Sequence, residues 1–301
     1  MSVPADLPRA EALKGSTTVS VILPARDEAA TVGLLVQALT DALAGLVDEI
    51  VVVDDGSADA TAQVALAAGA RVITAQDVRP DIAPAGKGGA MWRGLAATTG
   101  DLVVFLDADV ADFAPAWVAS LLLPLLEDPD VHLVKAAYER PLEVDGVVHP
   151  GSGGRVTRLL ATPLLSLVAP DLTVFAQPLA GETAARRGLL SRVELLGGYG
   201  VELALLLDAH ALVGLDGLAQ VDLGERRHRH QSDEALAHMA TSVLAVVADR
   251  QGWPVKDHAY SRVRRQGAVF EHVSTPLTAV VLPPLASEIT PSGRSQVMFD
   301  N

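Results

Sequence analysis

Apolar and polar positions alternate in blocks along the first 140 residues, and the blocks predict strands and helices in turn. Short apolar runs indicate buried strands, whereas apolar residues spaced three or four apart indicate helices. The predicted strands are 19–24, 49–54, 72–73, 101–107 and 132–138, and the predicted helices are 30–43, 60–66, 89–97 and 115–126. This alternation predicts an α/β fold with a mostly parallel central sheet and helices on both faces.

The pattern beyond residue 140 is less regular. We expect a glycine-rich loop at 147–154 and an irregular segment at 177–183, with a kink or break at Pro163 in a helix between them. The later predicted elements are a helix at 201–212, a strand at 219–223 and a helix at 232–250 that Ser232 caps. The proline-rich residues after 252 are poorly periodic, and we assign them no element.

The N-terminal residues 1–16 are polar and rich in proline and alanine, without an apolar signal core, and are expected to form a flexible tail. No uncharged apolar run reaches the roughly 18 residues that a membrane span needs. The run at 273–287 comes nearest but contains three prolines. We therefore expect no membrane partner.

Composition narrows the functional classes. The chain has 301 residues, 50% of them hydrophobic, and no cysteine, which excludes a disulfide framework and a thiolate metal site and fits a cytoplasmic location. Its net charge of −14 argues against nucleic acid as a partner. A phosphorylated substrate must then bind a local cationic pocket, and Arg226-Arg227-His228-Arg229-His230 is the candidate.

Carboxylates follow three of the predicted strands. Pro24-Ala25-Arg26-Asp27-Glu28, Asp54-Asp55-Gly56-Ser57 and Asp107-Ala108-Asp109 each come directly after an apolar run. The carboxyl ends of parallel strands share one edge of the sheet, where α/β proteins bind ligands. Two carboxylates there can hold a divalent cation that neutralises a diphosphate leaving group. The alternative is that these residues are helix caps and turns, as Asp59 could be.

These strands and turns resemble those of GT-A glycosyltransferases, and blocks in the second half resemble glucosyl-3-phosphoglycerate synthases. The resemblance covers residues 17–252 and implies a GT-A fold with a Rossmann-like sheet. The blocks are Gly86-Lys87-Gly88, Gly153-Gly154-Arg155-Val156-Thr157, Gln177-Pro178-Leu179-Ala180-Gly181-Glu182, Gly198-Tyr199-Gly200-Val201-Glu202 and Leu223-Gly224 followed by Arg226, His228 and Arg229.

The resemblance implies a role for each donor-side residue. Asp107 would lie near the sugar or ribose, and Lys87, flanked by glycines, would pair with a phosphate. Lys87 could instead be a solvated loop lysine, and Ser57 a turn hydroxyl. The full expected donor set is Pro24, Ala25, Glu28, Asp55, Ser57, Lys87, Asp107, Ala108 and Arg226.

The expected acceptor site lies at the start of the helix at 155–167. Free backbone N–H groups, a guanidinium and a hydroxyl at Gly154, Arg155 and Thr157 would hold a phosphate. A glycine-broken loop with a surface arginine is the alternative. Tyr199 and Glu202 would face the acceptor or the donor sugar.

The resemblance also implies a metal, Mg²⁺ or Mn²⁺, held by Asp109 and His228. Diphosphate and water oxygens would complete its shell. His230 competes with His228 for this role. A zinc ion held by both histidines is a remote alternative, because no cysteine and no helical histidine spacing support it.

Glu202, Asp107 and Lys87 are the expected catalytic residues, but residue types alone leave the stereochemistry open. An inverting enzyme would use Glu202 as a general base. The resemblance implies retention instead, and Gln251-Gly252-Trp253-Pro254 does not supply the Q-x-x-R-W block of processive inverting polymerases.

The resulting hypothesis is a metal-dependent retaining enzyme that transfers glucose from UDP-glucose to the 2-hydroxyl of 3-phosphoglycerate, as a homodimer. Residues 17–140 would bind the nucleotide sugar, 141–252 the acceptor, and 253–301 would form a partly irregular extension. The alternatives are a mannosyl enzyme with the same acceptor, a polyprenyl-phosphate enzyme, a nucleotidyltransferase and a catalytically silent nucleotide-binding protein.

Overall fold

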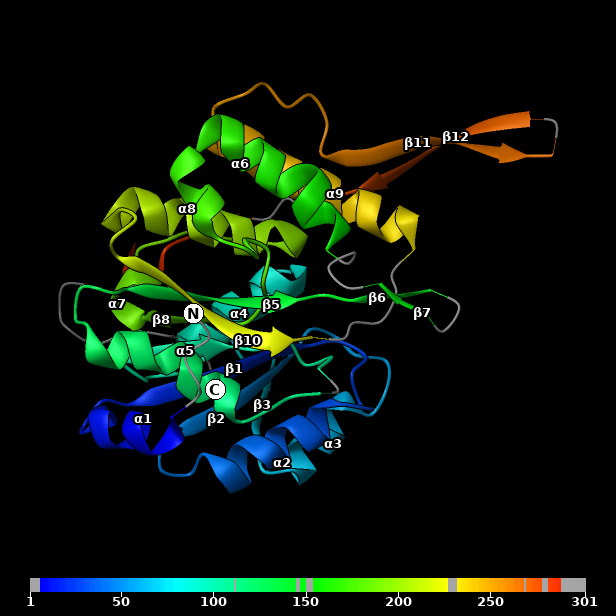
Figure 1. Ribbon diagram of the computed structural model, residues 1–301. Coiled ribbons are helices and arrows are strands. Elements are labelled where there is room, and N and C mark those ends of the chain that lie inside the picture. Colours follow the sequence, from blue (N-terminus) through cyan, green and yellow to red (C-terminus); the bar gives the residue numbers. More distant parts are fainter. Residues whose placement is uncertain are drawn as a thin grey trace.

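A computed structural model describes residues 6–110, 112–144, 147–149, 154–226, 232–267, 269–277 and 281–287. Within them, seven strands form the central sheet in the order β10-β5-β8-β4-β1-β2-β3 (Figure 1). Of these strands, β8 alone runs antiparallel to its neighbours. The strands are β1 Val19–Ala25, β2 Glu49–Asp54, β3 Arg71–Thr74, β4 Leu102–Phe105, β5 Leu133–Glu139, β8 Thr183–Arg186 and β10 Leu218–Glu225.

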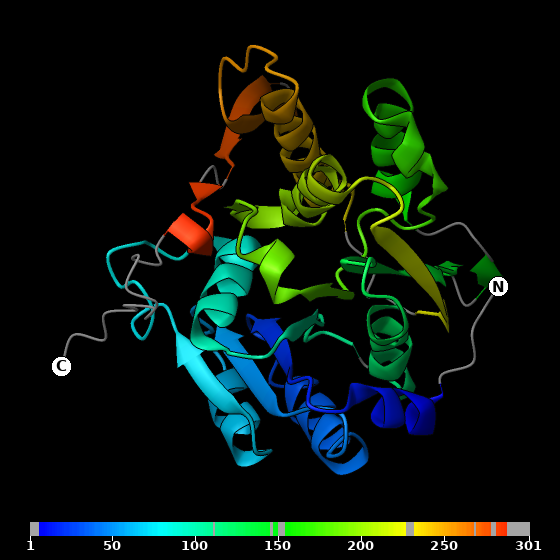
Figure 2. The same cartoon turned by 90° about the vertical axis from the view of Figure 1, so that its left-hand side faces the viewer.

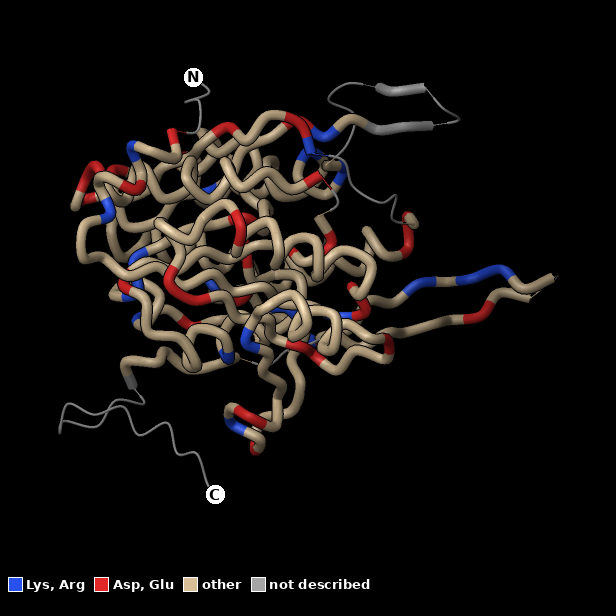
Figure 3. Tube along the Cα trace, turned by 90° about the horizontal axis from the view of Figure 1, so that it is seen from below, with Lys and Arg blue, Asp and Glu red and all other residues tan. Residues whose placement is uncertain are grey.

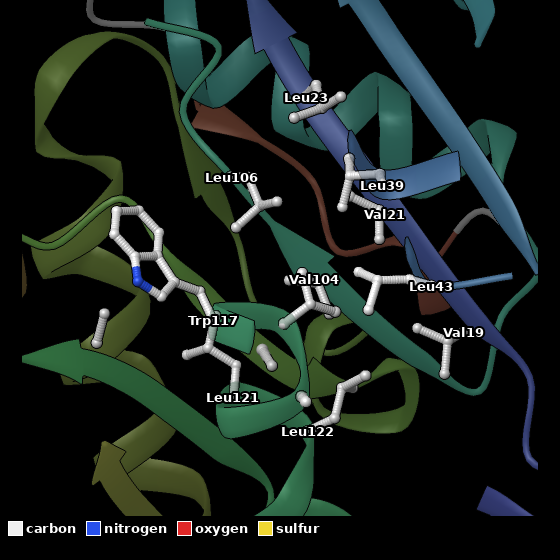
Figure 4. Close-up of a cluster of buried hydrophobic side chains, with 14 of the residues drawn as sticks. Val19, Val21, Leu23, Leu39, Leu43, Val104, Leu106, Trp117, Leu121 and Leu122 are labelled. Atoms are coloured by element: carbon white, nitrogen blue, oxygen red, sulfur yellow. The ribbon is translucent and has the colours of Figure 1, made fainter. Parts of the chain in front are cut away.

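Helices cover both faces of this sheet, as the runs of apolar residues require for strands buried on two sides (Figure 2). One core packs the first face against α1 Leu7–Lys14, α2 Val32–Ala42, α3 Thr61–Ala67 and α5 Ala116–Glu127. In Figure 4, Leu39 of α2 lies beside Val21 of β1, and Trp117 of α5 belongs to the same cluster as Val104 of β4. The second core packs the other face against α4 Gly86–Ala97, α6 Thr162–Val168, α7 Arg187–Leu190, α8 Val201–Val213 and α9 Asp233–Arg250.

The predicted α/β alternation is confirmed, but the sequence pattern did not indicate β8. Residue 183 was expected to end an irregular segment, and residues 184–186 were assigned no element. The sequence of β8, Thr-Ala-Ala-Arg, carries little hydrophobic pattern. It lies between β4 and β5, where Thr183 pairs with both Phe105 and Lys135. Because β8 is antiparallel, its first residue lies at the edge where the parallel strands end.

The expected flexible tail is wrong for residues 7–14, which form α1. Asp6 caps this helix by accepting the N–H of Arg9 at 3.1 Å. Arg9 pairs with Glu127 at 2.6 Å and Lys14 with Asp48 at 2.9 Å, and Ala10 is fully buried. This short helix is stabilised by its cap and by ion pairs and has no apolar stripe, so hydrophobic periodicity could not predict it.

The segment after β5 also differs from expectation. Residues 147–149 of the expected loop form a strand, β7, paired with β6 Leu142–Val144. A π-helical stretch, η1 Thr157–Ala161, precedes α6 close to Pro163. Proline lacks the N–H that a regular helix needs, which gives a physical reason for irregular helix at the predicted kink. The short helix η2 Pro170–Val174 follows α6.

The C-terminal region contains elements that the sequence pattern did not indicate. β11 Ala259–Gln266 and β12 Val269–Pro276 form a hairpin that projects from the body (Figure 1), with Lys or Arg residues along one strand (Figure 3). β13 Val281–Leu282 pairs with β9 Leu195–Leu196, and Leu282 is buried in the second core. The remaining short helices are η3 Gly198–Gly200 and η4 Leu285–Ser287.

Helices long and apolar enough to cross a bilayer do not occur in the part of the chain that the structure describes.

The buried face of α2 should carry much of the stability of the first core. Leu39→Ala removes a fully buried side chain and should lower the free energy of unfolding by about 2–5 kcal/mol, through lost burial and a cavity. Urea denaturation followed by circular dichroism measures this change. Leu34→Ala on the same helix is the control, because Leu34 is 71% exposed. Equal losses in the two variants would contradict the assigned packing.

Candidate active site

The loops that follow β1, β2 and β4 are tied together at the carboxyl edge of the sheet. The N–H of Asp55 donates to the carbonyl of Ala25 at 2.9 Å. The hydroxyl of Thr31 donates to the carbonyl of Ala108 at 2.7 Å. The structure thus brings the three predicted carboxylate-bearing turns to one edge, as the strand order requires.

Several residues of the expected donor set are used within these loops. The hydroxyl of Ser57 donates to the carboxylate of Asp54 at 2.5 Å and accepts a hydrogen bond from the N–H of Asp27 at 3.0 Å. The backbone of Asp27 has a φ of 58°. The N–H of Glu28 donates to the hydroxyl of Thr61 at 2.8 Å. The observed bonds of Ser57 are those of a turn hydroxyl, and they hold the β1 and β2 loops in register. Pro24 lies in β1, opposite Val53 of β2.

Asp55 joins these loops to the start of α4. Burial raises the pKa of its carboxyl, although Arg26 and Arg93 oppose the shift, and the carboxylate accepts the N–H of Gly86. Gly86 has a φ of 64°, and a Cβ there would lie 3.5 Å from the backbone of Gly198. The close approach of Gly86 and Gly198 places the Tyr199 segment beside the donor loops.

Lys87 lies in the first turn of α4, which begins at Gly86, three residues before the predicted start at 89. Its ammonium pairs with Asp107 and, at 2.6 Å, with Glu202 at the start of α8. Burial alone would lower the pKa of Lys87, but the two carboxylates raise it above its ordinary value. The alternative of a solvated loop lysine is wrong, because this ammonium joins two elements of the site.

Arg226 directly follows β10 and is 1% exposed. Its guanidinium lies 3.2 Å from a carboxylate oxygen of Asp107 and 3.2 Å from one of Asp109, and it also pairs with Glu182. Its Nη1 donates to the Tyr138 hydroxyl at 3.3 Å. One buried guanidinium therefore fixes both carboxylates of the Asp107-Ala108-Asp109 motif.

The two motif carboxylates are in different ionisation environments. Burial would raise the pKa of Asp107, but Lys87 and Arg226 hold it well below the ordinary value. Burial and the negative charge of Asp107 instead raise the pKa of Asp109. Asp107 is thus a firmly ionised partner of the cations, whereas Asp109 would gain most from a further positive charge.

Two buried residues at this edge had no role assigned from the sequence. Glu182, fully buried before β8, pairs with Arg226, and burial raises the pKa of its carboxyl. Lys135 of β5 is also fully buried and donates to the Thr183 hydroxyl at 3.1 Å. The available signals were a glutamate ending one of the matched blocks and a single lysine inside an apolar strand. We call Lys87, Asp107, Asp109, Glu182, Glu202 and Arg226 the charged cluster.

The expected acceptor residues lie at the start of the helical segment before α6. Arg155 pairs with Asp233 in the first turn of α9, so an incoming phosphate would compete with this carboxylate. Gly154 has a φ of 66°, and Thr157 is buried. Tyr199, in η3, is half-exposed.

The expected metal ligand His228 and its competitor His230 lie outside the described residues, as does the rest of the cationic run after Arg226. Among the described residues, no three His, Asp or Glu side chains group as a metal site. Asp109 nevertheless fits Mg²⁺ or Mn²⁺, because it presents hard carboxylate oxygens and its side chain is 42% exposed. Such ions take few protein ligands and accept water and phosphate oxygens for the rest.

Comparisons with known proteins agree with this geometry. The family model for Glycosyl transferase family 2 matches residues 20–164. A glucosyl-3-phosphoglycerate synthase of Mycolicibacterium smegmatis is 49% identical over 243 residues, 80% of each chain, and one of Petrotoga mobilis is 38% identical over 241 residues, 79% of this chain and 74% of the relative.

Solved structures show the same likeness in three dimensions. Glucosyl-3-phosphoglycerate synthase of Mycobacterium tuberculosis, in complex with Mn²⁺, UDP-glucose and phosphoglyceric acid, superposes with a TM-score of 0.83 at 39% identity, over 94% of this chain and 95% of that one. Its complex with Mg²⁺ and UDP gives a TM-score of 0.84 at 38% identity, over the same shares of the two chains. The GT-A architecture and the nucleotide-sugar-dependent transferase class follow. The chain belongs to the glucosyl-3-phosphoglycerate synthase family of glycosyltransferases.

Proposed function

We propose that this protein transfers the glucosyl group of UDP-glucose to the 2-hydroxyl of 3-phosphoglycerate with retention of configuration. The observation that carries the proposal is the ammonium of Lys87, which joins Asp107 on the donor side to Glu202 on the acceptor side. The relatives that resemble this chain over most of its length are named for this activity, and one was solved with both substrates.

In this proposal the donor binds over the ends of β1, β2 and β4. Asp55 contacts the nucleoside, bordered by Pro24, Ala25, Glu28 and Ser57, while Lys87 and Arg226 face the diphosphate. Both cations are held by carboxylates before substrate binds. A diphosphate that enters the site would therefore share cations that are already fixed in place, which limits the reorganisation needed to stabilise the leaving group. Asp107 and Ala108 would lie beside the sugar and ribose.

Asp109, with His228, would hold Mg²⁺ or Mn²⁺. When bound, such an ion neutralises charge on the diphosphate leaving group. The raised pKa of Asp109 fits this role, since an adjacent cation would favour its ionised form.

The acceptor would bind between the start of the helical segment at 155 and η3. Gly154, Arg155 and Thr157 hold its phosphate, and Tyr199 borders the glycerate. Arg155 already faces a carboxylate, that of Asp233, which shows that its guanidinium can pair with an anion in this position. The phosphate would take the place of that carboxylate.

Glu202 positions the acceptor or the sugar in this scheme and is held by Lys87. In a same-face reaction the acceptor hydroxyl lies on the leaving-group side of the sugar. The departing phosphate oxygen can then accept its proton, and no protein base is needed.

We also propose that the protein works as a homodimer in the cytoplasm, which fits its lack of cysteine. The β11–β12 hairpin supports self-association, because it projects from the body with Val263, Val269 and Phe270 each more than 60% exposed. A second copy would cover these side chains. Sedimentation velocity should give twice the mass of one chain, and a single-chain mass at micromolar concentration would contradict it.

Product analysis tests the activity directly. With UDP-glucose, 3-phosphoglycerate and Mn²⁺ or Mg²⁺, the expected product is α-linked glucosyl-3-phosphoglycerate, read from the anomeric coupling in the proton NMR spectrum. EDTA should abolish its formation, and GDP-mannose should replace UDP-glucose poorly. A β-linked product would overturn retention and make Glu202 a general base.

Arg155 should recognise the acceptor phosphate. Arg155→Ala should raise the KM for 3-phosphoglycerate by roughly ten- to a hundredfold, the loss expected for a charge-assisted contact, and leave the KM for UDP-glucose nearly unchanged. Initial-rate kinetics measure both constants. The control is Arg158→Ala, which removes an exposed arginine three positions along the chain. Equal effects on both substrates would show that Arg155 is structural.

A further inference from the structure

Lys135 is a fully buried lysine in the second strand from one edge of the central sheet. It lies on β5, between Thr183 of β8 and Gln220 of β10, and its strand neighbours Leu133, Val134 and Ala136 are apolar. An ammonium is seldom fully buried, because its removal from water is costly unless it is paired and hydrogen-bonded. The role of this buried ammonium therefore follows from its hydrogen bonds and from the charges around it.

The ammonium of Lys135 donates to the carbonyl of Ala180 and to the hydroxyl of Thr183, the latter at 3.1 Å. These acceptors flank Gly181 and Glu182. The N–H of Ala180 also donates to the carbonyl of Gln177 at 3.0 Å, so the turn is tied at its start as well. Lys135 thus fastens the turn of residues 180–182 to the sheet.

This turn packs directly on Asp107. A Cβ added to Gly181 would lie 2.4 and 2.5 Å from the two carboxylate oxygens of Asp107, so only the bare glycine backbone fits there. Glu182, the next residue, pairs with Arg226, which contacts Asp107 from another side. The position of the turn therefore helps to set the position of the Asp107 carboxylate.

Charged groups surround Lys135 on the elements that pack around the site. Glu202 of α8, Glu182 before β8 and Asp107 after β4 attract the ammonium, whereas Lys87 of α4 repels it. Burial is the largest effect and lowers the pKa of Lys135 to about 8, against the attraction of the three carboxylates.

We propose that Lys135 is a positioning residue for glycosyl transfer, which in its charged form holds the turn of residues 180–182 against Asp107. It does not touch the substrates in this role; it acts through Gly181 on the carboxylate beside the sugar. The kinetic part of its test rests on the proposed function, and the structural part does not.

The proposal separates the pH dependence of activity from that of stability. If the ammonium is needed, activity should fall as pH rises through about 8, the pKa of the folded protein. Between about 8 and the ordinary lysine value of 10.5, the unfolded chain binds more protons at this residue than the folded chain. Its contribution to the free energy of unfolding then rises with pH. If the ammonium served only to stabilise the fold, activity would not fall over a pH range in which stability is retained.

Two variants and one control test this role. Lys135→Met keeps the length of the side chain without the charge, and kcat should fall by about ten- to a hundredfold while the KM for 3-phosphoglycerate changes less than about threefold. Lys135→Arg stays charged at all accessible pH values, and its activity should lack the decline above pH 8. The control is Lys14→Met, which removes a lysine of α1 that pairs with Asp48. Its kcat and its pH profile should match those of the unmodified protein.

Hydrogen exchange followed by mass spectrometry tests the structural part of the proposal without substrate. In Lys135→Met, amides of residues 180–183 should exchange faster, while those of α2 should not change. An unchanged exchange rate in these residues, or an alkaline decline that persists in Lys135→Arg, overturns the proposal. If the unmodified protein forms no glucosyl-3-phosphoglycerate, the proposed function fails, and hydrogen exchange alone decides the role of Lys135.

Discussion

The arrangement of the site depends on the buried guanidinium of Arg226. It contacts Glu182 before β8 and the two motif carboxylates, Asp107 and Asp109, after β4, and so it joins the end of β10 to the start of β8 and the end of β4. Burying such a charge is costly, and removing one partner of a buried pair typically destabilises a protein by about 3–5 kcal/mol. The guanidinium is therefore tolerated only where its carboxylates are in place. This constraint fixes the motif carboxylates before any ligand arrives.

The reversed strand β8 is what allows this clustering. A parallel strand would direct its C-terminal end to the ligand edge, whereas β8 directs its N-terminal end there, with Glu182 and the turn of residues 180–182 in front of it. The same turn accepts a hydrogen bond from Lys135 and packs against the carboxylate of Asp107. The sheet thus carries buried charges of both signs at one edge. The buried cations and carboxylates stabilise one another through ion pairs. This is the preorganised polar setting in which a charged leaving group can be stabilised.

Hydrophobic periodicity predicted the parallel part of the sheet and most helices, because strands buried on both faces and amphipathic helices leave strong patterns. The same periodicity placed Asp55 and Asp107 at one edge, and the matched blocks singled out Lys87, Glu202 and Arg226. It missed β8 and α1, whose short sequences are held by pairing and by ion pairs. It also missed the role of Lys135, since a lysine in an apolar strand gives no sign of which carbonyls it will meet. His228 lies outside the described residues, and its role stays a prediction.

A crystal structure of the protein with Mn²⁺, UDP-glucose and 3-phosphoglycerate tests the central claim most directly, namely that the charged cluster is the site of glycosyl transfer. We expect the diphosphate beside Lys87 and Arg226, the metal on Asp109, the glucose against Asp107 and the acceptor phosphate on Arg155 in place of Asp233. Density for the nucleotide or the acceptor at another part of the sheet, with the Lys87, Asp107 and Glu202 contacts unchanged and untouched by ligand, would contradict it.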